Sequence, residues 1–456
     1  MSPSHLITEP IPKLLKELAV PASTGIIFNT FYNVVDTFYA GLLSTEAVAA
    51  LSMSFFLYFL IVGVGFGFGS AVTALIGNAQ GERNPLLASL YARKGIGFVI
   101  LLGIITGSFG LLFANDLLLV AGTDSHYLPL ALEYIHVVLF AAPLFMATYG
   151  LNAILVARGD TKSYRNMLIA GFFLNLVLNP LFIYGAGIIP SFGIAGIALA
   201  TVLIQCVSVV VLGYKVMHCG IFEKDDKTLQ MPDWLVYKNI FFQGLPPSMN
   251  MLTMSLGSVL TIYFVSSYGF KAVAGYGIAF RVEQIMLLPA LGISSAVLSL
   301  VSNNFGAGKI ERVYETVKLA LMYGASICVV GIVLGYSVGE WVVARFDADA
   351  EVITYAMTYL YIEVFIFFGY VILFICVSTL QGIKLPKVIF YVGVYRQIVA
   401  KIILFSIIVL WFKWPYVTIW YGFFFIVYSA AIFMGWYTYN ALHVRLHKST
   451  QSGAMV

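Results

Sequence analysis

Charged side chains are scarce in this sequence. They make up 10% of the 456 residues, against about 25% in a soluble domain, whereas hydrophobic residues make up 61%. A soluble fold cannot bury so much apolar surface, but a lipid bilayer accepts it at about 20 apolar residues for each helical span. The composition therefore predicts an integral membrane protein whose main partner is the lipid bilayer. No basic run with interleaved aromatic residues is present, which argues against nucleic-acid binding.

Cysteine is equally rare, and its positions carry no metal-binding pattern. The four cysteines are Cys206, Cys219, Cys328 and Cys376, and no two of them have the short spacing of a zinc site. We therefore expect small packing residues, with no metal site and no prosthetic cofactor. A cleavable signal peptide is not expected either, because residues 1–17 carry several charges and the apolar stretch that follows is long enough to be a retained span.

Long apolar segments, in contrast, recur along the whole chain. Several exceed 25 residues, which implies tilt or extension into the headgroup layer. Transmembrane strands are excluded because they would be about 10 residues long with alternating polarity. The predicted fold class is an all-α integral membrane protein with twelve transmembrane helices. The expected spans are Leu18–Leu43, Ala47–Gly77, Gly95–Phe113, Leu130–Val156, Met167–Gly187, Gly193–Met217, Ile240–Tyr268, Ala272–Val301, Leu319–Val338, Val352–Leu380, Val388–Phe412 and Trp414–Leu442.

The basic residues divide unequally between the two sides of this topology. Of the 25 lysines and arginines, nineteen fall on the side that holds the N-terminus, three on the other side and three inside spans. Cytoplasmic loops of membrane proteins carry an excess of Lys and Arg. We therefore expect a multi-pass protein of the cell (inner) membrane with both termini in the cytoplasm.

The one long polar connection, Cys219–Lys238, follows the sixth predicted span. It divides the chain into an N-terminal six-helix lobe (residues 1–218), a cytoplasmic linker (219–238) and a C-terminal six-helix lobe with a short tail (239–456). The adjacent Asp225 and Asp226 in this linker are more typical of a solvated charge cluster than of a metal site.

The two halves are related by an internal repeat. When the sequence is shifted by 225 positions, residues 21–83 match residues 246–308 at 14 of 63 positions without a gap. The matches include Pro21 with Pro246 and Ser23 with Ser248. Six helices in each half give both halves the same orientation, so we expect a parallel pseudo-two-fold repeat with a cavity between the lobes. A pore is less favoured, because no filter sequence such as TVGYG is present.

The repeat serves as a control for polar residues in the spans. Asp36 aligns with Thr261, so the first half carries a carboxylate that the second half lacks. An Asp at the centre of a span costs about 2.5–3.5 kcal/mol to insert, and such residues are candidates for function. Asn29, Tyr32 and Asn33 share one helix face with Asp36. This face predicts a functional site on the first span, with a buried structural role as the alternative.

Two further spans carry polar pairs at helical spacing. Asn175 and Asn179 lie four residues apart in the fifth span, and Thr201 and Gln205 lie four apart in the sixth. Burial in a bilayer favours the neutral form of a carboxylic acid, whereas nearby amides favour its ionised form or bind a cation. These residues are therefore compatible with binding either a proton or a sodium ion. The alternative role for the amides is packing between helices.

Three other residues depart from the pattern of a plain span. Pro21 removes a backbone hydrogen bond near the start of the first span and is either a hinge or an ordinary helix-entry proline. Arg281 and Glu283 stand where the first half has Phe56 and Tyr58. Because they lie two residues apart they do not face each other, so each of these C-lobe candidates is expected to pair with another group.

Four more ionisable residues lie within or near spans. Arg396 and Lys401 occur in the eleventh span, where pairing or snorkelling is the simplest expectation. His136 and Glu363 occupy matching Tyr-Ile-X positions in the fourth and tenth spans. Interfacial solvation is the expectation for both, with Glu363 the deeper of the two.

Three short motifs accompany the twelve-span repeat. They are NVVD at residues 33–36, ARGDTK at residues 157–162 after the fourth span, and its echo LQGIKLPK at residues 380–387 after the tenth. Together these features resemble the MATE (multidrug and toxic compound extrusion) transporters over nearly the whole chain. The resemblance implies that protons or sodium ions enter down their gradient while small organic, often cationic, substrates are exported.

The resemblance is to the DinF-like branch, whose fifth-span pattern NxxxDP is similar to the segment NLVLNP at residues 175–180. It implies that the coupling Asp of the first span is Asp36 and that the sixth-span Thr is Thr201. The predicted cation-coupling cluster is completed by Asn33, Asn175 and Asn179. Asn179 stands where many members have Asp, so the cluster keeps a single carboxylate, which favours a proton over sodium. The NorM-like branch has an acidic residue in the seventh span, and this sequence has none there.

The predicted function is that of a secondary active antiporter for multidrug efflux, coupled to inward proton movement by alternating access. Asn29, Tyr32 and Gln205 are the candidates for its substrate pocket, and we expect a monomer without enzymatic activity. Sodium-coupled export and a flippase for a lipid-linked precursor are the alternatives. A membrane-embedded prenyltransferase would need a DDxxD-like cluster, which the residues after Asp225-Asp226 do not supply.

Overall fold

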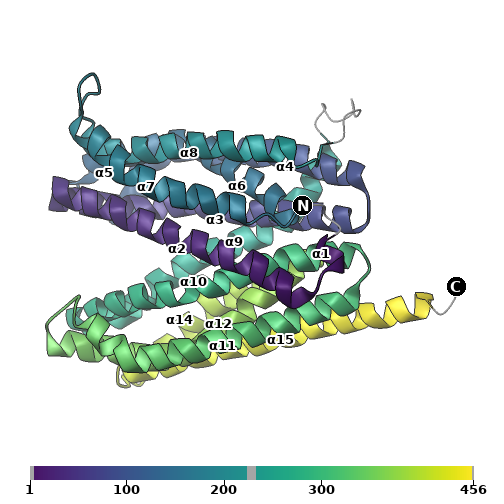
Figure 1. Cartoon of the computed structure of the whole chain (residues 1–456). Helices are drawn as coiled ribbons and strands as arrows, with labels where there is room; N and C mark the ends of the chain where they lie inside the picture. The colour runs from purple at the N-terminus through teal and green to yellow at the C-terminus, as the bar shows by residue number, and fades with distance from the viewer. Residues whose placement is uncertain (1–4, 223–232, 454–456) are drawn as a thin grey trace. The chain divides into compact units, whose positions relative to one another are not determined.

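The computed structural model describes residues 5–222 and 233–453, which are almost entirely helical (Figure 1). No strand occurs among these residues apart from one isolated bridge between Ala186 and Ile189. The helices of the first half are α1 (His5–Thr8), α2 (Ile11–Leu43), α3 (Thr45–Gly81), α4 (Pro85–Val120), α5 (Leu128–Phe140), α6 (Ala142–Ala157), α7 (Lys162–Tyr184) and α8 (Gly193–His218). Those of the second half are α9 (Trp234–Ser266), α10 (Phe270–Gly306), α11 (Ile310–Val343), α12 (Ala350–Gly382), α13 (Lys387–Val394), α14 (Ala400–Phe405) and α15 (Val417–Gly453), with the π-helical turns η2 (Tyr395–Val399) and η3 (Ser406–Trp411).

The described residues contain eleven helical segments long and apolar enough to cross a membrane, and the bent pair α5–α6 brings the number to twelve. This confirms the predicted all-α membrane fold with twelve spans. The fourth span, expected as one straight segment, is instead bent by 47° between Phe140 and Ala142. Pro143 lies in the first turn of α6, where its missing N–H and fixed φ suit a new helix start.

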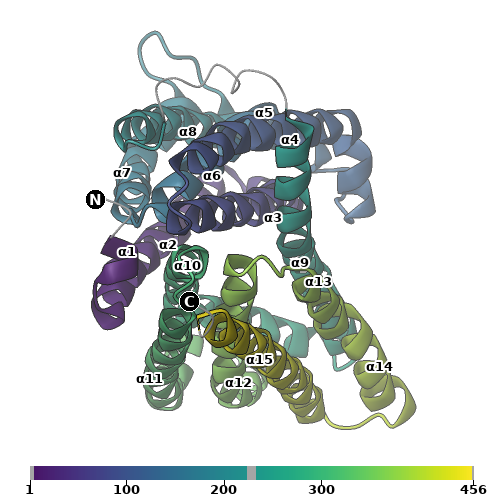
Figure 2. The ribbon, with the colours of Figure 1, turned by 90° about the vertical axis from the view of Figure 1, so that its right-hand side faces the viewer.

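The eleventh span is also irregular. It runs through α13, η2, α14 and η3, which follow one another along the chain (Figure 2). Turns with π-helical hydrogen bonding are rare, and they often accompany functional sites because they rotate the side chains that follow. Here they flank the short α14, which carries Lys401 near its start.

The helices form two compact units by their internal packing. Among the described residues, unit one contains His5 and Thr24–Met249, and unit two contains Leu6–Ser23 together with the residues from Asn250 onward. The boundary after Ser23 falls inside α2 and the boundary after Met249 falls inside α9, 226 residues further along the chain. The predicted division at a linker of residues 219–238 stays a prediction, since residues 223–232, with Asp225 and Asp226, lie outside the described residues.

Each unit contains a close helix contact that the repeat relates to the other. In unit one Ser248 of α9 packs so closely on Gly67 of α3 that a methyl group on this glycine would overlap the serine. In unit two Ser23 of α2 packs in the same way on Gly292 of α10. Each serine hydroxyl also makes a long hydrogen bond to a carbonyl of the helix that it meets, at 3.5 and 3.4 Å. The sequence identities at these positions therefore correspond to one packing device used twice.

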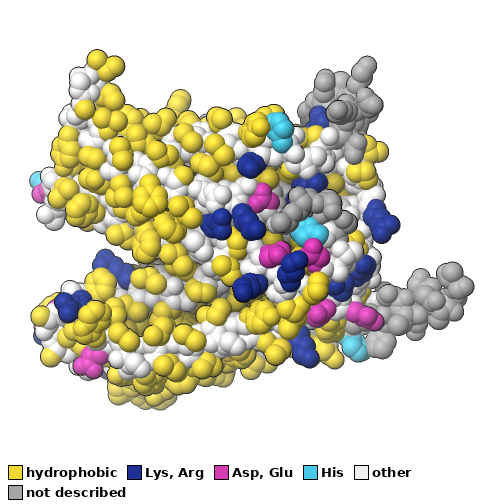
Figure 3. Space-filling view, viewed as in Figure 1, with side chains coloured by type: hydrophobic (Ala, Val, Ile, Leu, Met, Phe, Trp, Pro, Cys, Tyr) yellow, Lys and Arg dark blue, Asp and Glu magenta, His cyan; other side chains and the backbone are white. Residues whose placement is uncertain are grey.

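Hydrophobic side chains cover most of the visible helix surface, as expected for surfaces that face lipid (Figure 3). The four cysteines are free, in agreement with a packing role. Pro21 is buried within α2, which continues through it without a break.

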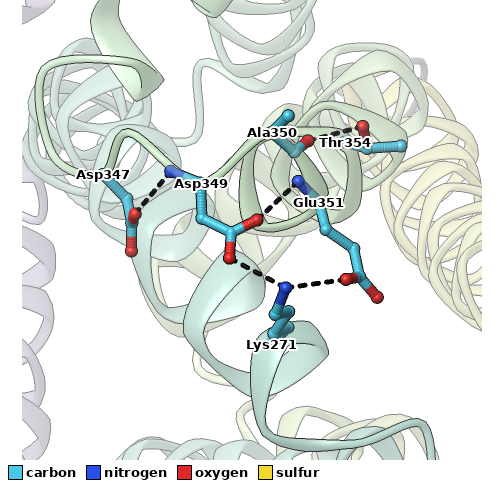
Figure 4. Close-up of polar contacts among 6 residues, drawn as sticks. All are labelled: Lys271, Asp347, Asp349, Ala350, Glu351 and Thr354. Atoms are coloured by element: carbon cyan, nitrogen blue, oxygen red, sulfur yellow. Dashed lines mark hydrogen bonds and ion pairs between the residues drawn. The ribbon is translucent and has the colours of Figure 1, made fainter.

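An exposed ion-pair cluster joins α10 to the start of α12. Lys271 Nζ lies 2.8 Å from Asp349 Oδ2 and 2.8 Å from Glu351 Oε2 (Figure 4). Asp349 also caps α12 by accepting a hydrogen bond from the Glu351 amide at 2.8 Å. The hydrogen bond from the Lys271 ammonium lowers the pKa of the Asp349 carboxyl below its usual value. Because these side chains are 31–56% exposed, the cluster contributes little to stability.

Candidate functional site

Asp36 lies at the centre of a buried polar cluster in unit one. Its Oδ1 accepts hydrogen bonds from Asn175 Nδ2 and from Asn179 Nδ2, each at 2.9 Å. Asn179 Nδ2 also donates to Asn175 Oδ1. Asp36 is 4% exposed and both asparagines are fully buried. The structure therefore brings together the first-span carboxylate and the fifth-span amide pair.

Local sequence explains why α7 presents both amides to α2. Asn175 and Asn179 lie one helical turn apart and so share a face. Pro180 lies inside α7 and has no N–H for the carbonyl of Leu176, four residues earlier. The Tyr39 hydroxyl on α2 donates to that Leu176 carbonyl at 3.1 Å. The proline thus creates a free acceptor, and a tyrosine close to Asp36 uses it to hold the two helices together.

A second link lies one turn before Asp36 on α2. The Tyr32 hydroxyl donates to Thr201 Oγ1 at 2.8 Å, and Thr201 in turn donates to the Ile197 carbonyl at 3.2 Å. Thr201 therefore positions Tyr32 and makes no hydrogen bond to Asp36. Gln205, one turn further along α8, accepts a hydrogen bond from Thr148 at 3.0 Å.

The other two candidates of the first span, Asn33 and Asn29, lie outside this hydrogen-bonded cluster. Asn33 is half-buried, and its side chain makes no hydrogen bond to the described residues. Asn29 is exposed. Their predicted roles in coupling and in substrate binding stay predictions. Two aromatic residues that the sequence did not single out, Tyr58 and Tyr134, interact electrostatically with Asp36.

Two oxygen atoms of the cluster have no donor in the described part of the chain. No described side chain donates to Asp36 Oδ2, and Asn179 Oδ1 is buried without a hydrogen-bond partner. A buried acceptor without a donor, such as Asn179 Oδ1, is rare in proteins, and together with the undonated Asp36 Oδ2 it suits either a proton on the carboxyl group or a small cation. Among the described residues, no group of three or more His, Cys, Asp or Glu side chains is placed to hold a metal ion.

The equivalent position in unit two is built differently. Thr261, the repeat partner of Asp36, accepts a hydrogen bond from Lys401 Nζ at 2.9 Å, and the same ammonium donates to the Gly257 carbonyl at 2.9 Å. Lys401 is 3% exposed and Arg396 is 5% exposed, so both are buried and neither snorkels to an interface.

The remaining ionisable candidates differ in how deeply they are buried. Glu283 is buried and accepts a hydrogen bond from the Tyr359 hydroxyl, whereas Arg281 is exposed. The expectation of interfacial solvation is wrong for Glu363, which is fully buried at 0% exposure. It lies on the face of α12 that packs against its neighbours, a fact that its position along the span could not reveal. His136 is exposed, as expected.

The family comparison gives the same repeat register. The sequence profile of the MatE family matches residues 21–181 and 246–407, and the two matched segments begin 225 residues apart. Together they cover more than half of the chain.

Characterised relatives and solved structures point the same way. The chain is 28% identical over 312 residues to the "Probable multidrug resistance protein YoeA" of Bacillus subtilis, which covers 68% of this chain and 67% of that protein. It is 26% identical to the FAD transporter of Shewanella oneidensis, covering 70% of each chain. It is 23% identical to the multidrug export protein MepA of Staphylococcus aureus, covering 76% of each.

Solved structures share the fold at lower identity. An outward-facing multidrug resistance MATE transporter of the MOP superfamily superimposes with a TM-score of 0.90 at 22% identity, over 97% of this chain and 98% of that one. A MATE structure in the bent conformation gives a TM-score of 0.89 at 21% identity, over 99% of both chains. The chain therefore belongs to the MATE family of multidrug efflux transporters.

Proposed function

We propose that this transporter exports organic, often cationic, small molecules in exchange for protons, and that Asp36 is the group that takes up and releases the proton. The observation that carries the proposal is the buried carboxylate of Asp36 inside a span, to which, among the described residues, two neutral amides donate hydrogen bonds and no cationic group does. A buried charge without a fixed cationic partner is costly, so such a group exchanges a proton or binds a cation.

The single carboxylate favours a proton over sodium. A hard cation prefers several oxygen ligands with adequate negative charge, and Asp36 supplies the only formal charge among the three bonded side chains. A proton needs only one carboxyl oxygen, and Asp36 Oδ2 has no described donor. Sodium coupling, with Asn179 Oδ1 as an additional ligand, is the second candidate.

Coupling would act through α2. This helix carries Asp36 in unit one, while its residues as far as Ser23 belong to unit two, and Pro21 lies close to that boundary. Protonation removes the charge that the amides stabilise and so changes the contact between α2 and α7. Alternating access then follows if the two ion states favour different arrangements of the same helix. Pro21 is the proposed hinge.

The substrate class comes from the family rather than from a pocket. Relatives are described as multidrug exporters or, in one case, as an FAD transporter. Tyr32 and Gln205 remain candidates for substrate contact, together with Asn29. Transport of a lipid-linked precursor is the competing substrate class.

The deciding experiment measures export in proteoliposomes with proton and sodium gradients imposed separately. A proton gradient alone should drive export of an organic cation, and a sodium gradient at fixed pH should not. Sodium-driven transport without proton dependence would show that carboxylate and amide oxygens suffice for sodium.

The proposed location is the cell (inner) membrane, with both termini in the cytoplasm and the monomer as the transporting species. Cysteines introduced into residues 219–238 should be protected from impermeant reagents in intact cells. Labelling from outside would overturn this topology.

A further inference from the structure

We propose that unit two contains a cation site that the chain fills itself: the ammonium group of Lys401 occupies the position that repeats the Asp36 site. The ligand class of this site is a primary ammonium ion, supplied by a side chain instead of by solution.

The repeat relates the two sites through both helices that form them. Asp36 on α2 corresponds to Thr261 on α9 at an offset of 225 residues. Asn175 on α7 lies in the fifth span of the first half, and Lys401 lies in the eleventh span, which is the fifth of the second half. The same pair of helices therefore meets in both units, with a carboxylate held by amides in one and an ammonium held by oxygens in the other.

The ammonium is well satisfied where it lies. Lys401 Nζ donates to the Gly257 carbonyl and to Thr261 Oγ1, each at 2.9 Å. It also lies 4.9 Å from the centre of the Phe423 ring, within the range of a cation–π contact. A lysine ammonium has three N–H donors, and two hydrogen bonds with one aromatic face account for its surroundings without water.

Buried carboxylates supply the opposite charge. Glu283 and Glu363 both interact electrostatically with Lys401. Glu363 is fully buried and interacts with Glu283 and with the Tyr359 hydroxyl. Arg396 is the second buried cation and lies 5.5 Å from the Tyr370 ring. Lys401 is thus one of two buried basic groups that interact with these two acids, and its removal would leave Arg396 as the other.

A tethered ammonium cannot leave its site. While the lysine fills this position, no cation from solution can bind there, so of the two repeat-related positions Asp36 is the one left open to a coupling ion. This last consequence rests on the proposed function, but the Lys401 site itself does not.

The test removes the tether and offers the cation from solution. Lys401→Ala deletes three methylene groups and the ammonium, which n-propylammonium replaces. In purified wild-type protein, n-propylammonium should leave the unfolding temperature unchanged. In Lys401→Ala, the unfolding temperature should fall by at least about 5 °C and rise again with the n-propylammonium concentration. Tetramethylammonium, which has no N–H donor, should not restore it.

Lys401→Met is the matched control, because it keeps the volume of the chain and removes the charge. It should be less stable than wild type and should not respond to n-propylammonium. The proposal is overturned if n-propylammonium fails to stabilise Lys401→Ala, or if Lys401→Met is as stable as wild type.

If Lys401→Ala does not fold, the test is instead the unfolding temperature of the double variant that combines Lys401→Met with Glu363→Gln. Removal of an acid that interacts with Lys401 should make the double variant more stable than Lys401→Met alone, and equal stability would reject the site. None of these measurements involves transport, so their failure is separate from failure of the proton-export proposal.

Discussion

The same helix contact is built with opposite charge in the two units. In unit one, Asp36 is held by the amides of Asn175 and Asn179. In unit two, Thr261 takes the place of the carboxylate and binds the ammonium of Lys401. A repeat can therefore keep its backbone arrangement while one copy presents a carboxylate at this contact and the other an ammonium.

The neighbouring turn shows the same divergence. In unit one, Tyr39 donates to the carbonyl that Pro180 leaves without a helical donor. The repeat partner of Tyr39 is Phe264, whose ring packs edge to face on Phe405 of the eleventh span with centroids 5.7 Å apart. Without the proline there is no free carbonyl, so the hydroxyl has no role and an aromatic contact replaces it. The polar character of unit one at this contact is thus a local specialisation, and the following variants test it.

The largest effect is expected for Asp36→Asn. The new amide still offers an oxygen to Asn175 and Asn179, so the protein should fold and insert normally. It cannot bind a proton, so it should lose the gradient of roughly 50-fold that one proton moving through about 100 mV can sustain for a neutral substrate exchanged for it. Drug accumulation in proteoliposomes under a proton gradient measures this. Wild-type export by the folded variant would remove Asp36 from the mechanism.

The repeat-related substitution Thr261→Val should act on stability instead. It removes one of the two hydrogen bonds to the buried Lys401 ammonium, and a lost bond to a charged group costs about 1.5–3 kcal/mol. Thermal unfolding in detergent, compared with Asp36→Asn, checks the contrast. If Thr261→Val unfolds at the wild-type temperature, the ammonium is not held as described.

The paired variants Gly67→Ala and Gly292→Ala ask whether the two serine contacts are equivalent. A methyl group at either glycine would overlap the facing serine, and overpacking of this kind costs about 1–3 kcal/mol. Both should therefore lower the unfolding temperature by similar amounts. Gly213→Ala is the control, since a methyl group there meets no atom within 4 Å and should be neutral or slightly stabilising. Unequal losses would mean that the two contacts have diverged in strength.

A smaller loss of stability is expected for Tyr39→Phe. This change gives unit one the residue type that unit two has at the repeat-related position, Phe264. The Leu176 carbonyl would lose its donor, at a cost of about 0.5–1.5 kcal/mol for one neutral hydrogen bond. The reverse change, Phe264→Tyr, adds a hydroxyl where no proline has freed a carbonyl and should bring no gain. Thermal unfolding of both variants measures the difference, and a stabilised Phe264→Tyr would contradict it.

The smallest effect is expected for Lys271→Met in the exposed cluster of unit two. The depressed pKa of Asp349 means that the pair stabilises the protein above the ordinary pKa of 3.8 and loses that effect as pH falls through the lower value of the folded state. Unfolding temperatures of variant and wild type should differ slightly at neutral pH and converge in acid. A difference that persists in acid would have another origin.

The number of spans, the parallel repeat and Asp36 as the exceptional first-span residue could be read from the sequence. Hydropathy is a local property, a fixed offset of 225 residues shows itself without any structure, and a lone carboxylate stands out against an apolar span. The sequence also marked Asn175 and Asn179 as a pair, because their spacing places them on one helix face.

Only the tertiary structure decided which faces meet. Asp36 bonds an amide 139 residues away, Lys401 bonds Thr261 140 residues away, and Glu363 is fully buried although its position suggested an interface. Hydropathy cannot supply these partners, because in a bilayer every span is apolar and the choice of neighbours depends on shape and on the few polar groups that must be satisfied. The role of Lys401 therefore depends on the tertiary structure, which brings its ammonium to a carbonyl and a hydroxyl oxygen of another helix.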